Sequence, residues 1–434
     1  MKRAVCCLAI FLTAAPMLCS FFSRAQPAAA AAKDDSTLRY VVYLERHGVR
    51  SPTGNPDKYA AYSAAPWPKW GVPPGYLTPH GFELMRIFGA YDRAELAAEG
   101  LLAPTGCADA GAVTFLADSD QRTRETGKAL AEGMFPGCAP EVHARPEGDQ
   151  DPLFHSIKAG IGKPDRALAM AAVEGRIGGS ANNLTEAYRP QLEMLDRILA
   201  GCGRVAAANP NRISIPNAPV ESHGDEIRGP VSVASSMAES LLLEYADGMK
   251  GADLGWGCLD QAQLREALQL HTADTEYTER TPLIARMDAS NLLAHILDAL
   301  EQNATDKVVP GAPGKPADRA LFLVGHDTNI ATVAGALDLN WIADGRRDDT
   351  PPGGALVFEL WRSDDGHGYA VRLYYTAQTL DQMRNLEELT PANPPARAPV
   401  FVPGCSRSDM SCPLPGFAAV VRQAIDPAFV AAQR

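Results

Sequence analysis

The stretch that decides the fold is Tyr40-Val41-Val42-Tyr43-Leu44, followed after Glu45 by Arg46-His47-Gly48-Val49-Arg50-Ser51-Pro52-Thr53. The apolar run is typical of a buried strand. The residues after it place one imidazole between two guanidiniums, whose planar forks of donors match the oxygens of a phosphate. Both cations would also lower the pKa of the imidazole, so that a nucleophilic nitrogen could remain unprotonated in acid.

The same pattern occurs twice more. Val113–Ala117 reads as a buried strand and is followed by Asp118-Ser119-Asp120-Gln121-Arg122-Thr123-Arg124. Leu321–Val324 is a third such strand and leads into Gly325-His326-Asp327-Thr328-Asn329. Short apolar runs, each followed by a turn and a helix-forming stretch, indicate parallel strands of an α/β sheet.

Ligands of such sheets bind at the carboxyl ends of the strands, and the helix N-termini found there favour an anion. If the three strands are neighbours, the polar residues that follow them meet in one crevice. The residues expected there are Arg46, His47, Arg50, Arg122, His326 and Asp327.

The predicted fold class is α/β, with a mainly parallel central sheet flanked by helices and an inserted, mostly helical smaller domain. We expect the core to comprise residues 34–155 and 305–434, with the helical insert at 156–304. Leucines and isoleucines between 192 and 199, and again between 293 and 300, recur on one face of a helix, which supports helices in the insert.

With these motifs the chain resembles the histidine acid phosphatases, in particular the bacterial periplasmic branch that contains phytases and glucose-1-phosphatase. The family motif is Arg-His-Gly-x-Arg-x-Pro near the start and His-Asp far downstream, and both are present. Further segments at 77–81, 151–154 and 350–358 are also similar to family segments. The resemblance covers nearly all of the chain after about residue 38.

The resemblance implies a role for each of these residues. His47 would be the nucleophile that forms a phosphohistidine, and Asp327 would protonate the departing alcohol and then help to activate water. For Asp327 the structural alternative is a helix N-cap, and Arg124 competes with Arg122. No metal and no cofactor is implied. By the same resemblance, the residues that would bind the phosphoryl oxygens are Arg46, Arg50, Thr53, Arg122 and His326.

The expected function is hydrolysis of a small-molecule phosphomonoester, by a phytase-like or broad acid phosphatase, with a glucose-1-phosphatase as the alternative. Phytases of this branch often carry a lysine where this chain has Gly54, and relatives can carry a basic residue near Asp288. The chain keeps Gly48 and Thr53, however, from which glucose-1-phosphatases depart. Two other classes of protein remain as alternative functions, a phosphoryl-transferring mutase and a non-catalytic phosphate-binding protein. The family also places a histidine near the pocket in a segment similar to that of His271.

The chain begins with a predicted signal peptide, residues 1–25. Lys2 and Arg3 precede the apolar stretch 4–22, and Ser23-Arg24-Ala25 offers a cleavage site, with a second possible site at 28–32. An uncleaved membrane anchor is the alternative. We expect a periplasmic or secreted protein that has no membrane contact after cleavage and is a monomer.

Removal of this segment takes away three basic residues, Lys2, Arg3 and Arg24, and no acidic one, so the formal charge falls from −12 to −15. So acidic a chain is not expected to bind nucleic acid.

Six of the nine cysteines follow the signal peptide, and an even number in an exported chain predicts disulfides. Fifteen connectivities are open to six cysteines. The family resemblance suggests Cys107 with Cys138 and Cys405 with Cys412, which leaves Cys202 with Cys258 by elimination.

Overall fold

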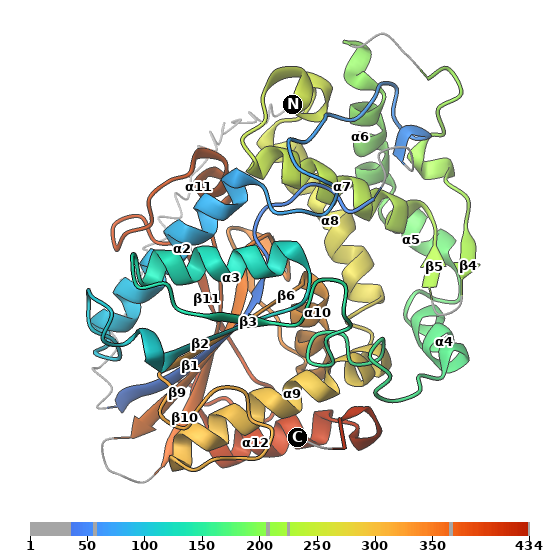
Figure 1. The fold of residues 1–434 in the computed structure, drawn as a ribbon. Helices are drawn as coiled ribbons and strands as arrows, with labels where there is room; N and C mark the ends of the chain where they lie inside the picture. Colours follow the sequence, from blue (N-terminus) through green and yellow to red (C-terminus); the bar gives the residue numbers. More distant parts are fainter. Residues whose placement is uncertain (1–35, 55–58, 205–208, 224–225, 364–367, 433–434) are drawn as a thin grey trace, which may run out of the picture. The chain divides into compact units, whose positions relative to one another are not determined.

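The computed structural model describes residues 36–54, 59–204, 209–223, 226–363 and 368–432 (Figure 1). The predicted signal peptide lies outside these residues. Within them, no helix combines the length and the apolar character that crossing a bilayer requires.

The centre of the described chain is an eight-stranded mixed sheet. Strands β1, β6, β2 and β3 run parallel and extend to one edge of the sheet, whereas β9 pairs antiparallel with β1 and is followed by the antiparallel β10 and β11. The α/β class is therefore confirmed, with antiparallel strands added to one side of the parallel part. In sheet order the strands are β11 (Ala396–Val400), β10 (Tyr369–Ala377), β9 (Ala355–Ser363), β1 (Ser36–Arg46), β6 (Ala320–Gly325), β2 (Val113–Ala117) and β3 (Val142–Ala144), with β12 (Cys412–Pro413) paired to β10.

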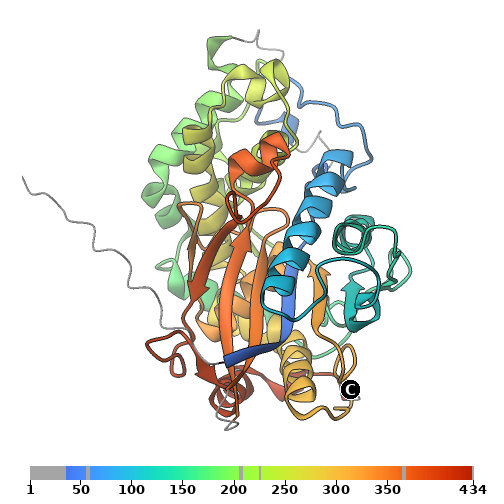
Figure 2. The ribbon, with the colours of Figure 1, turned by 90° about the vertical axis from the view of Figure 1, so that its left-hand side faces the viewer.

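Strand β1 shows why the sheet is covered on both faces. Its residues are almost all buried and alternate between two apolar clusters. Tyr40, Val42 and Leu44 belong to the cluster that contains the helices α9, α10 and α12, whereas Val41 and Tyr43 belong to the cluster of α2 and α3 (Figures 1 and 2). These helices are α2 (Pro79–Ala98), α3 (Gln121–Met134), α9 (Pro282–Thr305), α10 (Asp327–Leu337) and α12 (Leu414–Ala424).

The residues between β3 and α9 are mostly helical and have an apolar cluster of their own, built on α6, α7 and α8. Helix α9 instead packs against α10 and the sheet. The domain boundaries stay a prediction. The elements of this segment are α4 (Arg166–Arg176), α5 (Ala181–Ala187), α6 (Arg189–Leu199), β4 (Glu221–His223), β5 (Glu226–Arg228), α7 (Pro230–Ala246) and α8 (Gln261–Tyr277).

The remaining elements are short and connect the larger ones. They are β7 (Ile342–Ala343), β8 (Arg346–Arg347), α11 (Leu380–Asn385) and the 3₁₀ turns Ala110–Ala112, Gly201–Gly203, Ile215–Asn217, Gly251–Asp253, Gly255–Gly257 and Pro427–Phe429.

Two of the three expected disulfides are present, Cys107–Cys138 and Cys405–Cys412. The pairing inferred by elimination is not formed, because Cys202 and Cys258 are free thiols in the structure. The two side chains are nevertheless hydrogen-bonded, and burial together with this hydrogen bond raises the pKa of Cys258 to about 12.

Helices α2 and α3 approach each other through glycines. A Cβ atom at Gly133 would lie 2.0 Å from the carbonyl oxygen of Arg86, and one at Gly89 would lie 2.3 Å from that of Leu130. We therefore expect Gly133→Ala to destabilise the protein by about 1–3 kcal/mol, because the helix backbones must separate.

Gly175 provides a matched control in another helix, since a Cβ atom there meets nothing within 4 Å. Gly175→Ala should leave stability unchanged or raise it by up to about 1 kcal/mol. Urea unfolding of the three proteins measures both effects, and equal midpoints would show that the glycine contact does not limit the packing.

Candidate active site

The three predicted strand ends do meet at one edge of the sheet. The backbone amide of His47 donates to the carbonyl of Gly325 at 3.0 Å, and that of Asp118 donates to the carbonyl of Val324 at 3.0 Å. The side chains that follow the strands surround a cavity of about 330 Å³. Of the predicted site residues, His47, Arg50, Thr53, Arg122, His326 and Asp327 line it.

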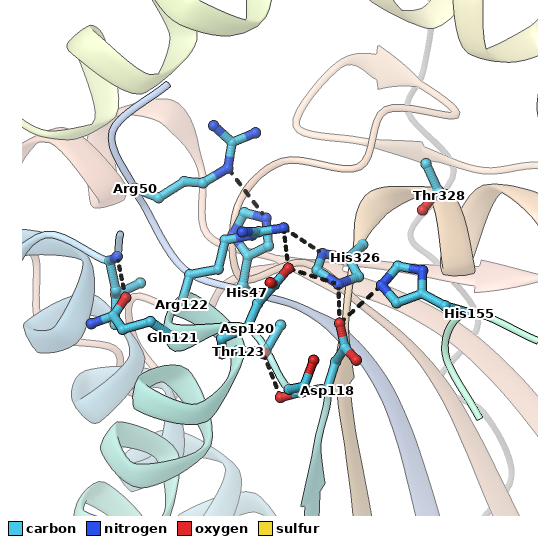
Figure 3. Close-up of polar contacts among 12 residues, drawn as sticks. His47, Arg50, Asp118, Asp120, Gln121, Arg122, Thr123, His155, His326 and Thr328 are labelled. Carbon is cyan, nitrogen blue, oxygen red and sulfur yellow. Dashed lines mark hydrogen bonds and ion pairs between the residues drawn. The ribbon is translucent and has the colours of Figure 1, made fainter. Parts of the chain in front are cut away.

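His47 is held with one ring nitrogen available. Its side chain is almost completely buried, and Nδ1 lies 2.9 Å from the carbonyl oxygen of Gly48. A carbonyl only accepts hydrogen bonds, so Nδ1 carries the proton and Nε2 is the unprotonated nitrogen that accepts from Arg50. Nε2 faces the Arg50 guanidinium, whose Nε lies 3.4 Å away (Figure 3).

Burial lowers the pKa of His47 well below its ordinary value, and Arg50, Arg122 and Arg46 lower it further. The neutral imidazole is thus favoured down to acidic pH.

Arg46 is not among the residues that line the cavity, and its side chain is completely buried. One guanidinium nitrogen lies 2.9 Å from Oδ2 of Asp327 and also bonds the carboxylate of Glu239 on α7. The carbonyl of Thr350 accepts from the other. Arg46 was predicted to bind phosphoryl oxygens, and this stays a prediction; in the structure its guanidinium pairs with Glu239 and Asp327.

Glu239 is the link between the sheet and the helical segment. Besides Arg46, its Oε1 lies 3.5 Å from Arg50, and its Oε2 lies 3.8 Å from Nε2 of His271. The His271 ring is fixed by Ser235, whose hydroxyl lies 3.1 Å from Nδ1. One buried carboxylate therefore supports two of the arginines and brings His271 to the base of the site.

His326 and Arg122 form the opposite wall with the carboxylates of the second strand end (Figure 3). Nε2 of His326 donates to Oδ2 of Asp118 at 2.6 Å, which fixes the orientation of the ring. Arg122 pairs with Asp120 at 2.5 Å and lies 3.4 Å from Nδ1 of His326. His155 donates to the same Asp118 oxygen at 3.0 Å.

Asp327 is the first residue of α10, where a helix terminus favours a carboxylate. Burial alone would raise its pKa, but Arg46, His271 and Arg50 hold the pKa well below its ordinary value. Its side chain is 25% exposed, so it can reach a molecule in the cavity while it remains paired with Arg46.

Arg122, which the sequence analysis preferred to Arg124, lines the cavity, whereas Arg124 is not among the lining residues and pairs with Glu147. The sequence analysis missed four residues of the site. Asp118 and Asp120 stand beside Arg122 at a strand end, which was a usable signal. Glu239 and His155 follow no strand of the sheet, so nothing local marked them.

A larger cavity, of about 730 Å³, is lined by none of the predicted site residues, although Ser51, Pro52 and Gly54, which lie next to Arg50 and Thr53 in the chain, line it. It is mostly apolar and is lined by the loop of Trp67 and Trp70. Trp67 stacks edge-on against Trp256, whose indole donates to the carbonyl of Pro66, so this loop is anchored on the helical segment.

The fold and the site define a phosphatase of the histidine type. Residues 37–376 match the model of the histidine phosphatase superfamily, branch 2, and the chain belongs to this family. It is accordingly a histidine acid phosphatase, a phosphoric monoester hydrolase.

Curated relatives agree with this assignment. The phytase AppA of Escherichia coli is 36% identical over 93% of this chain and 95% of its own length. The glucose-1-phosphatase of Salmonella typhimurium is 30% identical over 89% and 92%, respectively. Among solved structures, the phytase of Hafnia alvei in complex with myo-inositol hexakis sulphate has a TM-score of 0.82 and 35% identity, and the match covers 92% of this chain and all of that one.

The lowered pKa of His47 has a measurable effect on stability. Below about pH 6.5 the unfolded chain protonates this imidazole, whereas the lowered pKa in the folded protein delays protonation to lower pH. As the pH decreases below this value, the free energy of unfolding should therefore decrease as well, by up to about 1.4 kcal/mol per pH unit for this one group. His47→Asn removes the effect, so the variant should gain stability relative to the parent as the pH decreases.

The control is His143→Asn, because His143 is exposed. Urea unfolding between neutral and acidic pH in phosphate-free buffer measures both variants. A constant difference between His47→Asn and the parent protein over this range would show that His47 is not held neutral.

Proposed function

We propose that Nε2 of His47 attacks the phosphorus of a phosphomonoester. The bond from phosphorus to the alcohol oxygen breaks, the carboxyl of Asp327 gives that oxygen its proton, and a phosphohistidine remains. Water then attacks the phosphorus, Asp327 takes a proton from the water, and the bond between phosphorus and Nε2 breaks. The observation that carries this proposal is the unprotonated Nε2 in the cavity wall, which accepts only a long hydrogen bond of 3.4 Å from Arg50.

Arg50, Arg122 and His326 lie in the cavity wall, where they would bind the phosphoryl oxygens and stabilise the charge of the transition state. Arg122 now pairs with Asp120, and a phosphate would compete for it as a bidentate partner. Arg46 contributes by orienting Asp327 and by adding positive charge.

Asp327 must be protonated to act as an acid, yet the resting site depresses its pKa. A bound phosphate dianion would cancel much of the field of the surrounding cations and raise this pKa again. The reaction is therefore expected to be fastest at acidic pH, where the carboxyl is protonated more often and His47 is still neutral.

His326 needs both ring protons to donate to Asp118 and to a phosphoryl oxygen together. The hydrogen bond from Nε2 to Asp118 supports the charged ring, although burial and Arg122 lower the pKa of His326. Asp118 is thus proposed to hold His326 in the orientation and the protonation state that phosphate binding requires.

For the substrate we propose phytate-like inositol phosphates, with a broader range of phosphomonoesters as the wider reading. Phytases are prominent among the relatives and solved structures, and the Hafnia alvei enzyme binds an inositol hexakis sulphate. Glucose 1-phosphate is the alternative, because two curated relatives are glucose-1-phosphatases. The predicted signal peptide and the two disulfides support an exported, periplasmic enzyme.

The test is release of inorganic phosphate at acidic pH, with a chelator present, from phytate, glucose 1-phosphate and an aryl phosphate. We expect phytate to give the highest kcat/KM and His47→Ala to lose activity on all three by at least about 1,000-fold. Highest kcat/KM for glucose 1-phosphate would support the alternative substrate. Turnover that survives in His47→Ala would exclude the phosphohistidine route.

Asp327→Asn separates the roles of acid and nucleophile. Esters of alcohols need a proton on the leaving oxygen, whereas a nitrophenolate leaves without one. The rate of phosphoenzyme formation in the variant should therefore fall about 100-fold or more with glucose 1-phosphate, but much less with p-nitrophenyl phosphate. Rapid-quench measurement of the phosphoenzyme isolates this step, and equal losses on both substrates would contradict the role as the acid.

A further inference from the structure

Four side chains at the wall of the cavity meet around one point. Asp118, Asp120, His155 and His326 each offer one ligand atom, and these atoms all lie within 4.8 Å of one another. Nε2 of His326 lies 2.6 Å from Oδ2 of Asp118 and 3.7 Å from Oδ2 of Asp120. Figure 3 shows that both imidazoles are directed at the same oxygen of Asp118.

Two imidazole nitrogens and two carboxylate oxygens are a suitable ligand set for Zn²⁺, which binds four such atoms in a tetrahedron at about 2.0–2.2 Å. Neighbouring ligand atoms in a tetrahedron of that size are about 3.4 Å apart. The observed separations bracket this value, so modest side-chain rotations would complete the geometry. Imidazole ligands disfavour Mg²⁺ and Ca²⁺, which prefer oxygen.

The carboxylate of Asp118 provides a second observation in favour of a bound metal ion. Asp118 is completely buried. Its Oδ1 has no hydrogen-bond partner among the described residues, while Oδ2 receives both imidazoles. A buried carboxylate oxygen without a partner is unfavourable, and a divalent cation bound by this carboxylate would offset that cost.

We propose that Asp118, Asp120, His155 and His326 form a Zn²⁺ site whose occupation inhibits the enzyme. Ligation by Asp120 takes this carboxylate away from Arg122, with which it pairs at 2.5 Å. Ligation by Nε2 of His326 replaces the proton that now bonds Asp118. The metal thus dismantles one wall of the phosphate-binding cavity. The inhibition rests on the proposed function, whereas the binding of Zn²⁺ does not.

His155 is the residue that separates this proposal from the phosphatase machinery, because it belongs to the cluster but has no proposed part in the reaction. His155→Asn keeps a side chain that can donate to Asp118 and removes the zinc ligand. The matched control is His143→Asn on β3, where the ring contacts only the exposed Glu141 among the ion pairs of the described residues.

Equilibrium dialysis measures Zn²⁺ binding, and a p-nitrophenyl phosphate assay measures inhibition against the zinc-free rate of the same variant. Phytate is avoided because it chelates metals itself. We expect one Zn²⁺ per parent molecule, and at least about a tenfold weaker dissociation constant and inhibition constant in His155→Asn, but not in His143→Asn.

Equal zinc binding and inhibition in His155→Asn and the parent would overturn the site, as would no binding by the parent. Binding that is lost in His155→Asn without any inhibition of the parent would refute the inhibitory consequence alone. Dialysis with His47→Ala keeps the binding measurable even where catalysis fails. His155→Gln, checked by circular dichroism, replaces His155→Asn where the latter does not fold.

Discussion

The parallel pairing of β1 with β6 is the constraint on which the site depends. Its register sets Arg46 opposite Gly325, so the residue that follows each strand, His47 or His326, emerges at the same edge of the sheet. A shift by one residue would turn every side chain of β1 to the other face. Tyr40, Val42 and Leu44 would then lose their cluster with α9 and α10. Packing of the core therefore fixes the geometry of the nucleophile.

A second requirement is neutralisation of the cations that this register brings together. Arg46 has no exposed side-chain surface, and a buried guanidinium without a partner would be strongly destabilising. Glu239 and Asp327 supply that partner, and Glu239 also supports Arg50. Because Glu239 comes from α7, the helical segment is part of the electrostatics of the site.

The sequence was sufficient for residues that belong to a strand and the turn after it, since strand periodicity and strand order determine where such residues lie. It was insufficient where a partner is far away in the chain and follows no motif. Glu239 is 193 residues from Arg46, and only the packing of α7 brings them together. His155 likewise follows no strand of the sheet, and only the fold brings it to Asp118. The free thiols of Cys202 and Cys258 show that an even number of cysteines does not determine which of them pair.

The resting site is best understood as a set of cations that are held by protein carboxylates. Asp120 holds Arg122, Glu239 holds Arg46 and Arg50, and Asp118 holds His326. A phosphate dianion would compete with Asp120 for Arg122, whereas Glu239 and Asp118 can keep their partners. Two of these carboxylates, Asp118 and Asp120, also belong to the proposed Zn²⁺ site. Proposed inhibition by Zn²⁺ would therefore act through the carboxylates that support Arg122 and His326.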